Sequence, residues 1–145
     1  MYLTRHSDYS LRVLMFLAVN RDAVSTIPQI TAAYGISRGH LMKVVQHLGH
    51  LGYVKTLRGR GGGLQLGAEP ETIRLGAVVR QTEENLDLVE CFSARGKGCR
   101  IQPACRLKAA IKEALDAFLA VLDSYTLADM VHGRAAPLKR LLQLA

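Results

Sequence analysis

Residues 37–66, SRGHLMKVVQHLGHLGYVKTLRGRGGGLQL, contain a helical pattern followed directly by a strand-turn-strand pattern. The first residue is a serine, a good N-cap, and the apolar residues after it recur with helical spacing as far as Gly52. These apolar positions are Leu41, Val44, Val45, Leu48 and Leu51. Residues 53–58 then alternate between apolar and polar, as in a half-buried strand. Residues 59–63 form a turn with four glycines and one arginine, and residues 64–66 form the second strand. The stretch predicts a helix and a β-hairpin with a basic, glycine-rich tip.

Two further helices are expected before this stretch. Residues 7–20 carry apolar side chains at i, i+3, i+4 and i+7, with Ser7 or Asp8 as the cap. Residues 28–35 begin with a proline, which suits a first turn, and end with a glycine, which suits a helix end. Helix, helix, helix, strand, basic loop, strand is the order of a winged helix-turn-helix, whose third helix enters the major groove of DNA. A nucleotide-binding glycine loop would need a following helix and a Lys-Ser/Thr pair, and residues 59–66 lack them.

The positive charge of the chain is concentrated in its N-terminal half. Of the formal net charge of +7, residues 1–67 contribute +6, from eight Lys/Arg against two Asp. Residues 68–145 contribute +1, from eleven Lys/Arg against ten Asp/Glu. Concentrated positive charge indicates a polyanion binder, because neutralised phosphates release condensed counterions. A basic surface that only confers solubility is the alternative.

The expected DNA contacts lie on the third helix, the wing and the first helix. Side chains of the third helix are predicted to read base edges, while arginines of the wing and of the first helix contact the backbone or the minor groove. Glycines at the wing tip let the backbone approach DNA closely. The residues are Arg12, Ser37, Arg38, His40, Lys43, Gln46, Arg58, Arg60, Gly61 and Gly62. A two-fold symmetric dimer would bind a palindromic operator in double-stranded DNA.

The C-terminal half predicts one short and one long helix separated by a loop. Residues 72–84 read as a helix with Ile73, Ala77, Val78 and Val79 inward, and residues 85–102 show no sustained period. A long helix then begins at Pro103. Its apolar residues follow 4-3-4-3-4 spacing, at Leu107, Ile111, Ala114, Phe118, Val121 and Tyr125, with Leu115, Leu119 and Leu122 widening the seam. Apolar residues with heptad spacing pack against a second helix, so this helix is predicted to form the central contact of a homodimer. Folding back on its own domain is the alternative.

The expected fold is therefore mainly α with a small β-hairpin wing. A winged helix-turn-helix domain (residues 1–84) and a ligand-binding loop (residues 85–104) precede the dimerisation helix and two short helices, at residues 127–132 and 137–144, of the last segment (residues 105–145). No stretch approaches the roughly 20 apolar residues that span a bilayer, and the N-terminus lacks a secretory signal. The chain is expected in the cytoplasm, with no membrane partner.

Three cysteines, Cys91, Cys99 and Cys105, lie within fifteen residues and are flanked by Arg95, Lys97, Arg100 and Arg106. Thiolates favour zinc or an iron-sulfur cluster, and both normally need four ligands, so one is missing. The spacings of seven and five residues are too open for zinc knuckles and favour a cluster, with zinc and metal-free packing as alternatives. No catalytic residues are assigned, because the histidines nearest to the cysteines in sequence, His50 and His132, are distant.

Four segments together resemble a known family. They are LRGRGGGLQLG at residues 57–67, YGISRGHLMKVV at 34–45, PACRLK at 103–108 and LDSYTLADMV at 122–131. The chain is similar over nearly its whole length to the dimeric winged-helix iron-sulfur regulators that include IscR and RirA, and most of all to the nitric-oxide-sensing repressors among them.

The resemblance implies a ligand set and a signal. The IscR branch has a histidine three residues after its last cysteine, where this chain has Lys108, so that branch is disfavoured. In the nitric-oxide sensors an aspartate near the start of the first helix of the partner subunit completes the set, and Asp8 stands at the matching place. A carboxylate that faces the positive end of the helix is the other interpretation of Asp8.

The function expected from this resemblance is a repressor that releases operator DNA when nitric oxide nitrosylates or removes its cluster. A 4Fe-4S cluster is preferred, and a 2Fe-2S cluster is possible. An iron-responsive regulator of the RirA type, a redox electron carrier and a zinc-structured DNA binder remain as alternatives.

Overall fold

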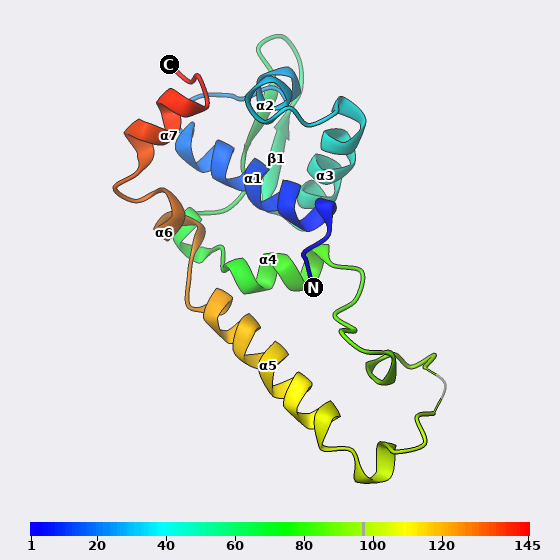
Figure 1. The fold of residues 1–145 in the computed structure, drawn as a ribbon. Coiled ribbons are helices and arrows are strands. Elements are labelled where there is room, and N and C mark those ends of the chain that lie inside the picture. Colours follow the sequence, from blue (N-terminus) through cyan, green and yellow to red (C-terminus); the bar gives the residue numbers. More distant parts are fainter. Residues whose placement is uncertain (97) are drawn as a thin grey trace.

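The computed structural model describes residues 1–96 and 98–145, so Lys97 lies outside the described residues. A body of helices and a hairpin carries one long helix, which extends away from it together with the loop that precedes it (Figure 1). The helices are α1 (Arg5–Val19), α2 (Ile27–Tyr34), α3 (Arg38–His50), α4 (Leu75–Thr82), α5 (Arg106–Asp123), α6 (Leu127–Val131) and α7 (Ala135–Leu141). The strands are β1 (Val54–Leu57) and β2 (Gly63–Leu66), and short 3-10 turns cover Pro70–Thr72, Glu90–Phe92 and Gln102–Ala104. The predicted fold class is confirmed.

Helices α1, α2 and α3 begin where a side chain caps them, but the cap of one helix differs from the predicted residue. Helix α3 begins at the predicted N-cap Ser37, and α2 is closed by a capping box between Thr26 and Gln29. The cap of α1 is Thr4, whose hydroxyl accepts from the Ser7 backbone N–H, so the prediction of Ser7 or Asp8 was wrong. The apolar stripe starts one turn later than the helix, because the first turn is polar.

The wing is a short antiparallel hairpin that is held to the body along one edge. Val54 pairs with Leu66, and Leu57 pairs with Gly63. Ser25, just before α2, forms a bridge with Leu64 through two backbone hydrogen bonds of 2.7 and 3.0 Å. Strand β2 is therefore fixed relative to the helices, while the turn at residues 58–62 projects.

The core lies around α1, which packs against α3 and α4 on different sides. The apolar patterns of α1 and α3 are buried as predicted. The apolar side chains with at most 2% exposure on these two helices are Val13, Leu14, Phe16, Leu17, Leu41, Val44 and Leu48.

Helix α4 is shorter than the predicted residues 72–84. A 3-10 turn precedes it, and Ile73 has an extended backbone whose carbonyl accepts from the Leu127 N–H at 2.8 Å. The Leu75 N–H donates to the Tyr125 carbonyl at 3.1 Å. This backbone pairing between distant segments keeps residues 73–74 out of the helix, so the predicted start was wrong.

The C-terminal end of α5 is joined to α4. Arg80 donates two hydrogen bonds, of 2.6 and 2.7 Å, to the carboxylate of Asp123, and this contact lowers the pKa of Asp123. Leu115 and Leu119 pack against Val79. The long helix therefore has a fixed direction relative to α4 and the helices that pack on it.

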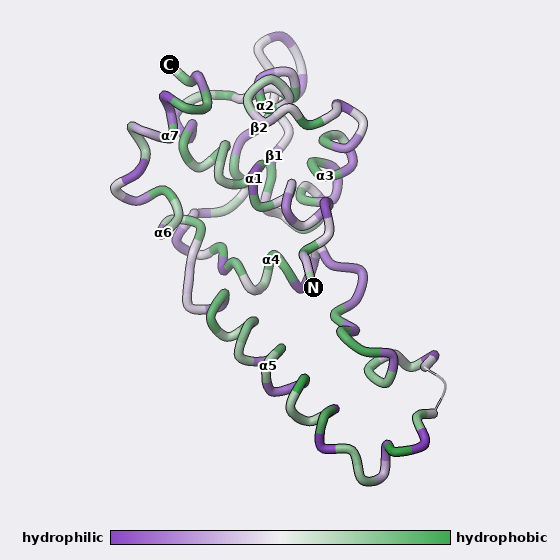
Figure 2. Tube along the Cα trace, viewed as in Figure 1, coloured by the Kyte–Doolittle hydropathy of each residue, from purple (hydrophilic) through white to green (hydrophobic). Residues whose placement is uncertain are grey.

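Much of the predicted seam of α5 stays uncovered in the single chain. Leu107 is 65% exposed, Val121 59% and Tyr125 46%, whereas it is the predicted flanking residues Leu115 and Leu119 that pack on the body. Helix α5 begins at Arg106 rather than Pro103, because a 3-10 turn occupies the preceding residues. Hydrophobic residues continue along α5 into the part that projects (Figure 2). No helix in the described parts of the chain is long and apolar enough to cross a bilayer.

Replacing Gly63 by alanine should loosen the wing. A Cβ there would lie 2.3 Å from the Ser25 carbonyl oxygen and 2.7 Å from Val24 Cγ1. Overpacking of this kind should lower the free energy of unfolding by about 2 kcal/mol, measured by urea denaturation. Gly39→Ala is the matched control, because nothing lies within 4 Å of its added Cβ. An unchanged midpoint for Gly63→Ala would contradict the close approach of the two backbones.

Candidate functional site

Helix α3 presents a polar face opposite its buried face. Its predicted base-reading residues are all exposed, and they are Ser37, Arg38, His40, Lys43 and Gln46. Leu41, Val44 and Leu48 on the other face are at most 1% exposed and anchor the helix in the core. The helix can therefore enter a groove without losing its packing.

The wing tip combines exposed cations with a tight backbone. Arg58, Arg60 and Gly61 are exposed, and Gly61 has a φ of +76°, which favours glycine. A Cβ on Gly62 would lie 2.3 Å from the Leu57 carbonyl oxygen. Glycine is required at both positions for this turn, and the turn presents the two arginines outward.

Arg12 has partners within the chain, which its prediction as a DNA contact did not include. Its Nε and Nη2 donate to Asp8 at 2.9 and 2.8 Å, and its guanidinium lies 5.8 Å from the ring centre of Tyr9 and 5.9 Å from that of Tyr34. The hydrogen bond to Asp8 raises the pKa of Arg12. Both oxygens of Asp8 are engaged, so the predicted fourth ligand is held by an arginine in this structure.

The three cysteines lie at the ends of short turns. Cys91 is within the 3-10 turn Glu90–Phe92, and the Cys99 carbonyl accepts from Gln102 at 3.0 Å. Cys105 is the N-cap of α5 and makes no side-chain capping bond. All three are free thiols; Cys99 is exposed and the other two are half-buried.

The structure does not bring the predicted ligands together. Within residues 1–96 and 98–145, no group of three or more His, Cys, Asp or Glu side chains is placed to hold a metal ion. The donor set nevertheless suits a thiolate-ligated centre. Its thiols are free, and Arg95, Arg100 and Arg106 are exposed in the same segment, where their charge can offset that of a thiolate-ligated centre.

A polar junction that sequence reasoning missed joins the first turn of α1 to the end of α4. Glu83 accepts hydrogen bonds from the backbone N–H of Thr4 at 2.8 Å and from its hydroxyl at 3.1 Å. The hydroxyls of Ser7 and Thr82 are both buried and lie 2.8 Å apart. The loop that carries the cysteines leaves α4 at this junction. Small polar residues on the inner face of an apolar helix were the available signal.

A second missed contact joins α1 to α3. His6 Nε2 and His47 Nδ1 lie 2.8 Å apart, so one of the two nitrogens donates to the other. Burial, and then His47, lower the pKa of His6 below its ordinary value. The first turn of α1 therefore contacts both the start of the cysteine loop and α3.

This fold and surface define a class, the winged helix-turn-helix DNA-binding proteins. The family described as "Rrf2: Iron-dependent Transcriptional regulator" matches residues 3–133. The chain belongs to the Rrf2 family of transcriptional regulators. It is a regulator and not an enzyme, as predicted, and the resemblance drawn from its sequence segments is confirmed.

Two relatives are similar along nearly the whole chain. The HTH-type transcriptional regulator NsrR of Geobacillus kaustophilus (strain HTA426) is 54% identical over 137 residues, which cover 94% of this chain and 93% of that protein. The HTH-type transcriptional regulator NsrR of Bacillus subtilis (strain 168) is 54% identical over 142 residues, which cover 97% of each.

Solved structures share the fold. CymR, the global cysteine regulator of B. subtilis, has a TM-score of 0.73 at 28% identity, covering 91% of this chain and 97% of that one. T. potens IscR has a TM-score of 0.72 at 24% identity, covering 92% and 88%.

Removing the Glu83 carboxylate should loosen the polar junction. Glu83→Ala leaves the Thr4 N–H without its acceptor and should cost about 1 kcal/mol of unfolding free energy. Hydrogen exchange should speed up most in the first turn of α1. Glu71→Ala, which removes an exposed carboxylate in the 3-10 turn Pro70–Thr72, is the control that should change neither measurement. Equal effects of the two substitutions would show that the junction has no special role.

Proposed function

We propose that this chain is a homodimeric, cytoplasmic repressor that binds a palindromic operator and releases it in response to nitric oxide, sensed through an iron-sulfur cluster. Three free cysteines on one loop beside a winged helix, in a chain 54% identical to NsrR regulators, carry this proposal. In this scheme residues 1–84 bind DNA, residues 85–104 belong to the cluster site, and residues 105–145 dimerise. The uncovered seam of α5 supports the last assignment.

The proposed ligands are Cys91, Cys99 and Cys105 of one protomer and Asp8 of the partner subunit. They supply the four donors of a 4Fe-4S cluster, and a 2Fe-2S cluster takes the same number. The nearby arginines offset the negative charge of such a centre. When bound, the cluster supplies iron that reacts with nitric oxide, and a carboxylate holds iron less firmly than a thiolate does.

Asp8 has two alternative partners in this proposal. Its oxygens either accept from Arg12, as in the present geometry, or serve the partner's cysteine site. Because the same oxygens are needed for both, ligation by Asp8 releases the Arg12 guanidinium, which can then contact the DNA backbone. Loss of the site returns Asp8 to Arg12 and withdraws that contact.

The α1 junctions give this exchange a route to the recognition helix. A displacement of Asp8 moves the helix turn that also contains Thr4 and His6, and His6 contacts His47 of α3. A tenfold to hundredfold change in DNA affinity needs only about 1.4 to 3 kcal/mol of coupling. A small displacement of α3 in both protomers is sufficient for release.

Iron limitation is a second candidate signal, because the matched family is described as iron-dependent. The two signals separate in titrations of the anaerobically purified dimer on operator DNA. Release by nitric oxide at constant iron supports the first, and release only by an iron chelator supports the second. Stoichiometric zinc without visible absorption would contradict both.

The wing cation Arg60 should contribute to DNA binding and not to the metal centre. Arg60→Ala should weaken operator binding and reduce the slope of log K against log salt by about one unit. Iron and sulfide content should not change. Arg134→Ala, an exposed arginine between α6 and α7, is the control. Loss of iron in Arg60→Ala would contradict this division of labour.

The carboxylate of Asp8 should be needed for a stable cluster. Asp8→Ala, purified without oxygen, should contain less iron and sulfide and show weaker visible absorption than the native protein. Its DNA binding should lose the response to nitric oxide. Asp22→Ala, at an exposed position beyond the end of α1, should behave like the native chain. Full iron content in Asp8→Ala would rule out the proposed fourth ligand.

A further inference from the structure

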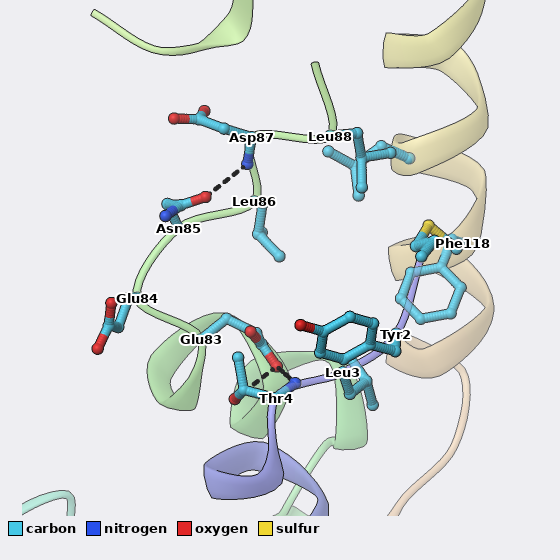
Figure 3. Close-up of a pocket in the computed structure, with 12 residues that line it drawn as sticks. Tyr2, Leu3, Thr4, Glu83, Glu84, Asn85, Leu86, Asp87, Leu88 and Phe118 are labelled. Atoms are coloured by element: carbon cyan, nitrogen blue, oxygen red, sulfur yellow. Dashed lines mark hydrogen bonds between the residues drawn. The ribbon is translucent and has the colours of Figure 1, made fainter. Parts of the chain in front are cut away.

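A pocket of about 590 Å³ opens between the N-terminus, the segment after α4 and the middle of α5. Leu86 and Leu88 point into the space between that segment and α5, where they face Phe118, and Tyr2 lies beneath them (Figure 3). Leu3 and Leu115 complete the apolar lining. A space of this volume with so apolar a lining is suited to receiving large apolar side chains.

The rim of this pocket is acidic. Glu84 and Asp87 are exposed there and point away from the cavity (Figure 3), while Glu83 is engaged with Thr4. Among the described residues, no lysine, arginine or histidine side chain lines the pocket. An occupant that carries an apolar side chain beside a cation would match both the interior and the rim.

The chain itself offers such a segment. Ile101 is 63% exposed and lies beside the exposed Arg100, between two of the cysteines. Leu107, 65% exposed, follows on the first turn of α5. This part of the chain extends away from the helical body (Figure 1), and the side chains of Ile101 and Leu107 are exposed in a single copy.

We propose that the pocket of each protomer receives Ile101 of the partner subunit, with the neighbouring arginine facing the rim carboxylates Glu84 and Asp87. This inference rests on the proposed shared metal site. The Asp8 N–H donates to the Thr4 carbonyl at 2.9 Å, so the pocket wall and the proposed ligand belong to the same helix turn. The chain turns between Cys99 and Gln102, and two residues span at most about 7 Å, so a partner loop that brings Cys99 to Asp8 also brings Ile101 close to the pocket.

Two-fold symmetry makes the exchange reciprocal, because each copy offers one Ile101 and one pocket. Insertion of Ile101 holds the cysteine loop of one subunit against α1 of the other, next to the position from which Asp8 must reach the loop. The pocket is thus the apolar part of the composite site, and it stabilises the dimer whether or not a cluster is bound. It also explains why the residues around Cys99 and Cys105 are basic, whereas the residues directly after α4 are acidic.

Photocrosslinking tests the assignment directly. We would place p-benzoylphenylalanine at position 101 in full-length protein and mix ¹⁴N-labelled and ¹⁵N-labelled copies before irradiation. Mixed-isotope crosslinks to residues 1–4, 83–88 or 115–118, which line the pocket, support the proposal. Crosslinks only within one copy, or only to other parts of the partner, overturn it. Native mass spectrometry that finds another molecule in the pocket overturns it too. The same label at Leu141, 72% exposed on α7, is the control and should give no such links.

A charge exchange gives a second test that does not depend on a bulky label. Arg100→Glu and Glu84→Arg should each weaken the dimer about fivefold to tenfold in sedimentation analysis, and the double variant should recover most of the loss. Strictly additive losses would overturn the pairing. A native-like dimer that responds to nitric oxide but crosslinks elsewhere defeats this inference alone. A dimer with the expected crosslinks and no nitric oxide response defeats only the proposed function.

Discussion

The packing of α1 between α3 and α4 is the constraint on which the rest of the molecule depends. Its inner face carries both the largest apolar side chains of the core and two buried serines, Ser7 and Ser10. Buried hydroxyls must be hydrogen-bonded, and the contact of Ser7 with Thr82 satisfies this requirement only at one register of α1 on α4. The Arg80–Asp123 ion pair and the backbone pairing of residues 73–75 with 125–127 then fix α5 on α4. The direction of the projecting helix is therefore determined by the same contacts that position α3.

Charge is divided among the parts of the chain according to what each part is proposed to contact. The N-terminal half carries the surplus cations, which the fold places on the face of α3 and at the wing tip. The later half is nearly neutral in sum, but it separates an acidic segment after α4 from a basic segment around the cysteines. A centre ligated by thiolates and a neighbouring acidic surface both favour cations in that loop, so one set of arginines serves two purposes in the proposed dimer.

Sequence patterns predicted the parts of the fold whose causes are local. The spacing of Leu41, Val44 and Leu48, the cap Ser37 and the glycines of the wing were sufficient for α3 and the hairpin. The start of α4 was missed because the backbone of Ile73 pairs with a segment more than fifty residues away. The Glu83 and His47 contacts were missed for the same reason. The cysteines were predicted to be ligands from their chemistry, and this stays a prediction, because a single chain supplies only three thiols and the fourth proposed donor belongs to another copy.

That incomplete ligand set explains how a modest signal can have a large effect. The Asp8–Arg12 contact is a half-exposed ion pair within one helix, and such pairs contribute about 0–1 kcal/mol. The proposed exchange of this contact for ligation in the partner subunit therefore costs little, and the reverse exchange is equally easy. If Asp8 were tightly buried, the proposed exchange would cost too much. If Asp8 had no partner in its own chain, the proposed cluster could not affect Arg12. The weakness of this contact, together with its position one turn from both junctions of α1, suits a switch that must transmit 1.4 to 3 kcal/mol, the estimated scale of such coupling.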